Sequence, residues 1–232
     1  VYLSDVDESG QMTPELLEKC IKKNKIKKLK GFFTMYLGGV VKNVYEFYKI
    51  KKKYKCYLIE DACHAFGSIY FYNNKKYKIG SCLHSDICIF SFHAIKTITS
   101  GEGGLLTTNK KIFYNQAKYF RSHGIKRKSI WDYDIEKLGF NYRLSDINAS
   151  LACSQLSKIK IFINKRKIIV NKYLKELNFG KKLRTQTTDK LFKNSANHLF
   201  IVFFNNRKTR DKYLRYMLKK KINININYKP IY

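Results

Sequence analysis

Two polar segments of the sequence carry side chains that could share one chemical task. In "LIEDACHAFGS", Glu60 and Asp61 follow an apolar run, and His64 lies three residues beyond Asp61. In "IFSFHAIK", Ser91 ends another apolar run, and Lys96 lies five residues beyond it. A carboxylate, an imidazole, a hydroxyl and an amine are therefore available for one site if the fold brings these two segments together.

Pyridoxal phosphate (PLP) requires groups of these types. Its aldehyde condenses with a lysine amine to form a Schiff base, and its pyridine nitrogen stays protonated beside a buried carboxylate. Its phosphate binds hydroxyls and backbone N–H groups, often at a Gly-rich turn. Lys96, Asp61 and Ser91 meet these needs, together with the "GEGG" turn that follows Lys96.

The same residues also have plainer interpretations. An acidic pair at a strand end is often a helix cap or a surface turn, and most lysines that follow a strand are solvated. Ser91 could serve only the backbone, and His64 could be a structural histidine. The pattern alone therefore leaves an α/β enzyme of another chemistry as an open alternative.

Strand and helix patterns alternate along the first part of the chain. A helix is expected over 13–23, with Thr13 as its cap and Pro14 in its first turn. The alternation predicts a layered α/β fold with a mainly parallel sheet, in which ligands gather at the carboxyl ends of the strands. Further strands are expected over 1–7, 31–37, 54–61, 85–92 and 103–108, and further helices over 40–53 and 111–121.

A smaller α/β unit is predicted in the last third of the chain. Its strand at 222–228 alternates Ile with Asn, which is the period of a half-buried strand. The domains are expected to be 1–160 and 161–232. Because a domain rarely ends on an uncovered strand, we expect both domains to be incomplete. The other expected elements are helices over 145–159, with Ser145 as a cap, 161–177 and 209–221, and a strand over 197–204.

The net charge of +30 has two interpretations. A nucleic-acid-binding protein would show basic runs such as "KNKIKKLK" and "KKKYK". Lysine is, however, spread along the whole chain with abundant Asn, Ile and Tyr, and no RNA-binding aromatic signature accompanies it. We therefore predict solvated lysine faces and no nucleic-acid partner.

The sequence does not indicate a membrane protein, a metal-binding protein or a disulfide-rich protein. No run approaches the ~18 uncharged apolar residues of a spanning helix, so no membrane association is expected. The six cysteines are scattered, and none forms a C-x-x-C pair, so neither a metal site nor a disulfide scaffold is expected. Small buried thiols of this kind suit a reducing cytoplasm.

Several segments, taken in order, resemble the sugar aminotransferase family of fold-type I PLP enzymes, which aminate nucleotide-linked keto-sugars. The resemblance implies a three-layer αβα large domain and part of a small C-terminal α/β domain. The matching segments are "IEDACHAFGS" (59–68), "IFSFHAIKTITSGEGGLLTTN" (89–109), "FRSHGI" (120–125), "LGFNYRLSDINASLACSQL" (138–156), "NHLFIV" (197–202) and "NYKPIY" (227–232).

The resemblance implies a role for five residues. Lys96 matches the Schiff-base lysine, and Asp61 matches the partner of the pyridine nitrogen. His64 matches a position near the ring hydroxyl of PLP, and Ser91 matches a phosphate ligand. Asn141 matches an asparagine that reaches the phosphate in the neighbouring subunit, which implies a homodimer.

Within the family, "FRSHGI" and "YKPIY" are most similar to enzymes of pseudaminic acid synthesis, and aminoarabinose-type enzymes of lipid A come next. The resemblance implies transfer of the amino group of L-glutamate to C4 of a UDP-linked 4-keto-6-deoxy sugar. The chain departs from the family at Asn227, where His is frequent, and family members are longer at both ends. An inactive truncated homologue and a nucleic-acid-binding protein stay as alternatives.

Overall fold

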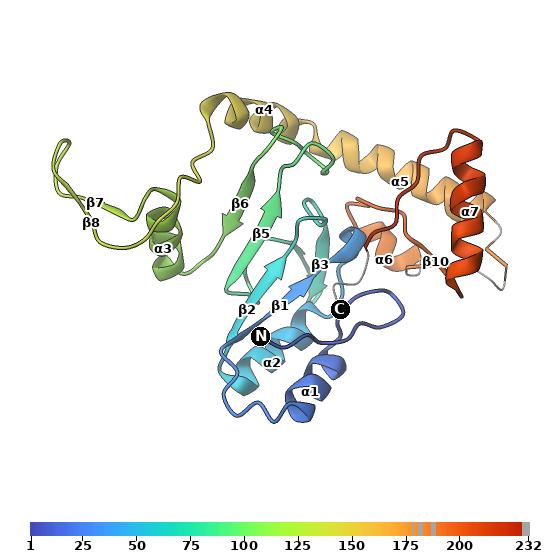
Figure 1. Cartoon of the computed structure of the whole chain (residues 1–232), viewed down its shortest axis with the longest axis horizontal. Helices are drawn as coiled ribbons and strands as arrows, with labels where there is room; N and C mark the ends of the chain where they lie inside the picture. Colours follow the sequence, from blue (N-terminus) through green and yellow to red (C-terminus); the bar gives the residue numbers. More distant parts are fainter. Residues whose placement is uncertain (178, 181–182, 187–188, 229–232) are drawn as a thin grey trace.

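The fold is built on a four-stranded sheet in the order β1-β2-β5-β6 (Figure 1). The computed structural model describes residues 1–177, 179–180, 183–186 and 189–228. The predicted α/β class with a mainly parallel sheet is confirmed, because only the last strand runs antiparallel to its neighbour. The four strands are β1 (Gly31–Met35), β2 (Tyr57–Asp61), β5 (Ile87–Ser91) and β6 (Gly104–Thr107).

The first two helices pack on this sheet. Helix α1 (Pro14–Lys23) begins as predicted, since the Thr13 hydroxyl accepts the Leu16 N–H at 3.3 Å. Helix α2 (Val44–Tyr54) begins later than the predicted start at residue 40, because a 3₁₀ turn, η1 (Leu37–Gly39), follows β1. The apolar faces of both helices and the strands bury one cluster: Leu17, Ile21, Phe32, Phe47, Ile50, Cys56 and Leu58.

Two predicted strands are wrong. Residues 1–7 and 222–228 are irregular, although the second segment has the alternation of a strand. A strand also needs a neighbouring strand to pair with, and within the described part of the chain neither segment is paired with one. The strand expected over 197–204 is reduced to β10 (Val202–Phe204), which pairs with β9 (Leu183–Thr185).

The sequence reasoning missed two hairpins. In the first, β3 (Ile69–Tyr72) pairs with β4 (Lys75–Lys78) through Asn73 and Asn74, which both have positive φ. Asparagine tolerates this conformation, so the Asn-Asn pair was a usable turn signal. In the second, β7 (Ile125–Arg127) pairs with β8 (Tyr133–Ile135).

Part of the chain extends away from the sheet. Helix α3 (Lys111–Arg121), at its predicted bounds, leads into the β7–β8 hairpin, and together they form an arm at one end of the molecule (Figure 1). The chain returns through α4 (Asp146–Ser157), where the Ser145 hydroxyl accepts the Asn148 N–H at 3.3 Å as predicted.

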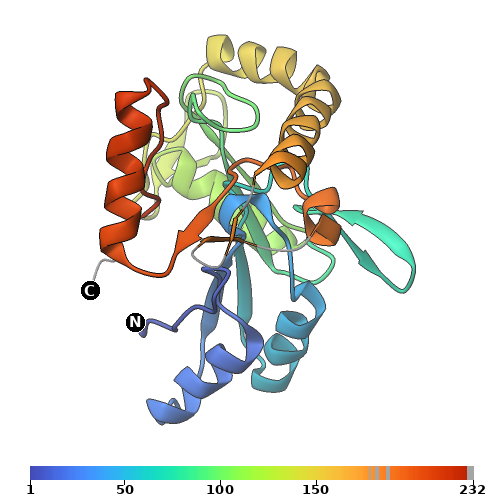
Figure 2. The same ribbon diagram turned by 90° about the vertical axis from the view of Figure 1, so that its right-hand side faces the viewer.

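Helix α5 (Ile159–Glu176) begins beside the predicted domain boundary at 160/161, and this boundary stays a prediction. Helix α6 (Asp189–Asn194), which the sequence reasoning missed, precedes β10, and α7 (Arg207–Lys219) follows it. Figure 2 shows α7 and the β3–β4 hairpin on opposite sides of the molecule. Within the described ranges, none of the helices is long and apolar enough to cross a membrane.

A buried carboxylate connects four elements at the amino ends of β2 and β5. Asp86 Oδ2 accepts the Leu58 N–H at 2.8 Å, and Oδ1 lies 3.0 Å from Lys51 Nζ and 2.5 Å from Lys110 Nζ. Although burial raises the pKa of Asp86, its bonds to Lys110, Leu58 and Lys51 outweigh that effect and lower the pKa. This single side chain therefore fixes β2, β5, α2 and the start of α3 relative to one another.

We predict that Asp86→Leu destabilises the protein by about 3 kcal/mol, because it leaves two ammonium groups and a buried N–H without their acceptor. The free energy of unfolding in urea measures this effect. Asp134→Asn is the control, since Asp134 forms an exposed pair with Lys128 and should change stability by less than about 0.5 kcal/mol. Equal effects of the two substitutions would contradict the assignment.

Candidate active site

The parallel register places Asp61 at the carboxyl end of β2, between Met35 of β1 and Ile89 of β5. Its carbonyl accepts the Tyr36 N–H at 3.1 Å, and its Oδ1 accepts the Cys63 N–H at 3.0 Å. The carboxylate is therefore oriented by the backbone that follows it, at the edge of the sheet where ligands gather in α/β folds.

Glu60, beside Asp61 in the sequence, belongs to the core. Successive side chains of a strand point to opposite faces, and Glu60 is 3% exposed. Its Oε1 accepts the Tyr36 hydroxyl at 2.5 Å and its Oε2 accepts the Ser85 hydroxyl at 2.8 Å. Burial raises the pKa of Glu60 despite these donors. Glu60 is thus a buried structural carboxyl group, and Asp61 is the carboxylate of the candidate site.

His64 lies in the turn after β2 and is 2% exposed. Its Nδ1 accepts the Gly38 N–H at 3.3 Å, so the neutral ring carries its proton on Nε2. Burial, followed by the positive charge of Lys96, lowers the pKa of His64 to about 4, while Asp61 opposes this shift. The imidazole is therefore an uncharged N–H donor at neutral pH.

Lys96 lies in the loop after β5, where its N–H donates to the His93 carbonyl at 2.9 Å. Its charge acts on Cys63 and His64, so the amine lies near the Asp61 turn. The side chain is partly buried, and within the described part of the chain no ion pair forms with it. Lys110, by contrast, is occupied by Asp86.

Ser91 lies beside the Gly-rich turn, as predicted. It pairs with Gly104 across β5 and β6, and its hydroxyl accepts the His93 N–H at 3.3 Å. Gly101 has φ +78°, and a Cβ built there would meet nothing within 4 Å. The turn therefore presents open backbone next to a hydroxyl.

Asn141 is not brought to these residues within one chain. It is exposed and forms a β-bridge with Ser122 at the end of α3, on the arm that extends from the sheet. The neighbouring Phe140 carbonyl accepts the His123 N–H at 2.8 Å, which fixes this loop to the arm. The structure thus brings together Asp61 and His64 with Lys96, and it leaves Asn141 apart.

Two residues near the site were missed in the sequence reasoning. The His198 ring lies 4.5 Å from the His64 ring, and the Tyr228 hydroxyl lies 3.3 Å from His64 Nε2. Both residues lie in segments that carry the family resemblance, His198 in "NHLFIV" and Tyr228 at the start of "YKPIY". Neither of them was assigned a role at the site from the sequence.

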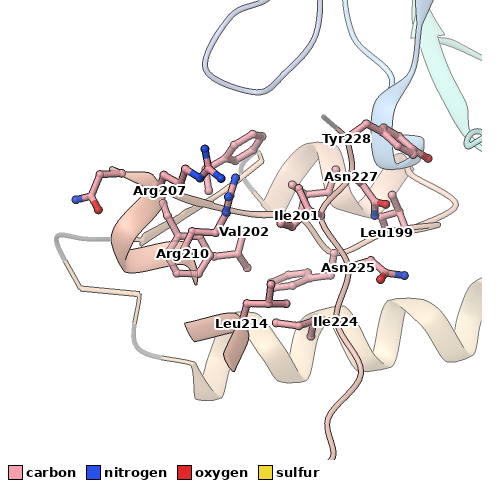
Figure 3. Close-up of a pocket in the computed structure, with 15 residues that line it drawn as sticks. Leu199, Ile201, Val202, Arg207, Arg210, Leu214, Ile224, Asn225, Asn227 and Tyr228 are labelled. Carbon is pink, nitrogen blue, oxygen red and sulfur yellow. The ribbon is translucent and has the colours of Figure 1, made fainter. Parts of the chain in front are cut away.

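A cavity of about 630 Å³ lies between β10, α7 and residues 224–228. Figure 3 shows Arg207 and Arg210 on one side of it and Asn227 and Tyr228 on the other. Both arginines pair with Asp211. Lys96 and Asp61 do not line this cavity, so it adjoins the site only through Tyr228.

The donor set fits PLP. Asp61 offers a carboxylate for a protonated ring nitrogen, Lys96 offers an amine outside any ion pair of the described residues, and His64 offers a neutral N–H. Ser91 and the Gly-rich turn offer phosphate donors. No group of three His, Cys, Asp or Glu residues able to hold a metal occurs in the described ranges.

The chain is similar to sugar aminotransferases of known sequence and structure. It is 35% identical to the UDP-4-amino-4,6-dideoxy-N-acetyl-beta-L-altrosamine transaminase of Campylobacter jejuni, over 100% of this chain and 60% of that protein. The transaminase of the same name from Helicobacter pylori is 31% identical over 98% of this chain and 58% of that protein. The chain therefore spans about 60% of the length of these relatives.

Solved structures agree with the sequence comparison. Helicobacter pylori PseC, an aminotransferase involved in the biosynthesis of pseudoaminic acid, matches 99% of this chain and 60% of its own, with a TM-score of 0.87 and 30% identity. A Streptococcus pneumoniae protein solved in a PLP form matches with a TM-score of 0.81 and 25% identity. The family model matches residues 1–232, so the chain belongs to the DegT/DnrJ/EryC1/StrS aminotransferase family.

Proposed function

We propose that the protein is a PLP-dependent aminotransferase that moves the amino group of L-glutamate to C4 of a UDP-linked 4-keto-6-deoxy sugar. The pathway is the biosynthesis of pseudaminic acid or a related surface polysaccharide. The similarity to the Campylobacter and Helicobacter transaminases supports the sugar nucleotide and the position of amination. The glutamate donor rests on the family resemblance of the site segments.

One observation carries this proposal. The strand ends of the sheet bring a backbone-oriented carboxylate, Asp61, to a neutral imidazole, His64, and to a lysine that no ion pair occupies within the described residues. A lysine on a solvated face would be surrounded by water or would pair with an exposed carboxylate, as Lys128 pairs with Asp134. The location of Lys96 beside two turns of the sheet favours a chemical role.

PLP, when bound, supplies an electron sink that stabilises negative charge at the reacting carbon. Lys96 would hold the cofactor covalently, and its amine, once released, would move the proton at the amino-bearing carbon of the donor as general base and acid. Asp61 would keep the ring nitrogen protonated, and the His64 Nε2–H would donate to the ring oxygen in place of the Tyr228 hydroxyl. Ser91 would bind the phosphate. The same residues would act in reverse on the keto-sugar.

The arm supports a homodimer in which Asn141 completes the site of the second copy. Large apolar side chains of the arm and α4 are strongly exposed, which is unusual for a monomer surface. Covering this face with a second copy would bury them and bring Asn141 to a partner site. The most exposed are Ile130 (82%), Trp131 (83%), Leu138 (81%) and Ile147 (81%).

The domain division and the location of the protein belong to the same proposal. Residues 1–160 form part of the PLP-binding large domain, and residues 161–232 begin a small domain. We propose a cytoplasmic protein, since its substrate is a nucleotide-linked sugar and its described thiols are free. No nucleic-acid partner belongs to the proposal. An inactive homologue is the second candidate, and the tests below separate it from an active enzyme.

Lys96 is predicted to be the lysine that binds PLP covalently. With the product of the complete gene, borohydride reduction of the PLP-loaded protein followed by peptide mapping should place a pyridoxyl label on Lys96. Lys96→Ala should abolish the visible band of the adduct and lower the transamination rate by at least about 10²–10⁴-fold, because general acid–base catalysis is lost. Asp61→Ala should keep the label and lose turnover.

Lys111→Ala is the matched control. Lys111 lies on the exposed start of α3, so its removal should leave label and rate unchanged. Lys110 is unsuitable because it pairs with the buried Asp86. A pyridoxyl label on a lysine other than Lys96 would refute the assignment, and a labelled but inactive parent protein would favour the inactive homologue.

The shared site is tested by mixing variants. If Asn141 acts in the partner's site, Asn141→Ala and Lys96→Ala subunits should each be inactive alone. After co-refolding in equal amounts, half of the dimers are hybrids with one intact site, so about a quarter of the parent activity should return. Mixed protein that never exceeds either variant alone would show that each subunit completes its own site.

A further inference from the structure

His198 reaches the site from a distant part of the chain. It lies between α6 and β10, and its side chain is buried with 7% exposure. Its ring centroid lies 4.5 Å from that of His64, with the two planes inclined by 46°. The sequence separates these two imidazoles by more than half of the chain, so only the tertiary fold brings them into contact.

The backbone around His198 is firmly attached to the η1 turn. The Ala196 N–H donates to the Ser68 hydroxyl at 2.8 Å, and the Leu199 N–H donates to the Gly38 carbonyl at 3.2 Å. Arg166 of α5 donates to the His198 carbonyl at 3.1 Å. These bonds fix the backbone at His198, and its side chain lies against the His64 ring.

The same turn determines which nitrogen of His64 carries a proton. The Gly38 N–H donates to the lone pair of His64 Nδ1, which therefore carries no hydrogen. The proton of the neutral ring is on Nε2, 3.3 Å from the Tyr228 hydroxyl. Gly38 thus orients both histidines, through its N–H to one and through its carbonyl to the backbone beside the other.

His198 Nδ1 is buried and has no hydrogen-bond partner among the described residues. A buried polar atom without a partner has lost its hydration, at a cost of about 1–3 kcal/mol, and an apolar ring would fill the same space without it. Such atoms in native structures call for an explanation, and function is a common one. Here the atom belongs to a ring that contacts a candidate cofactor ligand.

The charges around the two rings oppose protonation of either one. Burial, His64, Lys96 and Arg166, in that order, lower the pKa of His198 to about 3. Asp61 is the carboxylate that acts in the other direction on His64. Both rings are consequently uncharged at neutral pH, and a positive charge on one would repel the other. The groups that face the pair are Asp61, Lys96, Arg166 and Tyr228.

We propose that His198 is a positioning residue of the candidate active site, which keeps the His64 ring dry and uncharged, with the Nε2–H that meets the Tyr228 hydroxyl in this structure available to the bound cofactor. The inference rests on the proposed function, because the group that His64 would meet is the ring oxygen of PLP. The test uses protein without cofactor. The proposal about His198 can therefore fail while the aminotransferase proposal stands, and the aminotransferase proposal can fail while the one about His198 stands.

The experiment follows the imidazole nitrogens of the complete gene product, labelled with ¹⁵N-histidine and freed of cofactor, by NMR between pH 3.5 and 8. His64 in the parent protein should show one protonated nitrogen, Nε2, and should titrate near pH 4. His198→Asn removes the ring and admits water, so His64 should titrate at least about one pH unit higher, while the Gly38 N–H still keeps the proton of the neutral ring on Nε2. PLP affinity should fall about tenfold, the equivalent of one ordinary hydrogen bond.

Two further variants isolate the cause. His198→Phe keeps a ring against His64, so the His64 titration and tautomer should stay as in the parent. Phe192→Leu is the packing control, because Phe192 of the neighbouring helix α6 is buried in an apolar cluster with Val40 and Val170. It should destabilise the protein and leave the His64 titration unchanged. The same His64 titration in His198→Asn as in the parent would overturn the proposal.

Stability against pH gives a second measurement. A histidine whose pKa is lowered on folding binds its proton in the unfolded chain first, so stability is lost as pH falls below about 6.5. His198→Phe removes one such group and should reduce by about one the protons taken up on unfolding near pH 5. If His198→Asn does not fold, the titration of the parent protein still tests the proposal. A His64 ring that titrates near pH 6.5, or that carries its proton on Nδ1, would refute it.

Discussion

The close backbone approach at Gly38 and Gly39 is the constraint on which the candidate site depends. Both residues have positive φ, and a Cβ at either position would lie 2.6 Å from another atom, Gln186 Oε1 or the His64 carbonyl oxygen. The turn can therefore accept His64, Ser68 and the segment before β10 at hydrogen-bond distance. Any side chain there would separate the end of the sheet from the last part of the chain, and the two histidines with it.

The groups that balance each acidic side chain differ with the depth at which that side chain is buried. Acidic side chains are few against a net charge of +30, and among the described ones Glu60 and Asp86 are nearly fully buried. Asp86 is balanced by two lysines at one end of the sheet, and Glu60 is held by two hydroxyls inside it. Asp61 at the other end accepts the Cys63 N–H, and it forms no ion pair with Lys96 among the described residues.

Within one chain the arm lies apart from the candidate site, and in the proposed homodimer a second copy would connect the two. Asp61, His64 and Lys96 lie on adjacent strand ends, where one chain is sufficient to bring them together. Asn141 lies on the exposed arm with the large apolar side chains that a partner would cover. An aminotransferase built in this way would couple assembly to cofactor binding, since ligands of one phosphate would come from two chains.

The sequence by itself determined the class of the fold and the residues at the strand ends. Thr13, Pro14 and Ser145 indicated where helices begin, because capping depends only on residues close in sequence. The segments around Asp61 and Lys96 predicted a shared site, because parallel strands end at the same edge of a sheet. Tertiary structure decided the rest. Residues 222–228 have the period of a strand but pair with no strand among the described residues, Glu60 faces the core while Asp61 faces the site, and His198 meets His64 across a long stretch of chain. Strand pairing, burial and long-range contact depend on neighbours that local sequence does not specify.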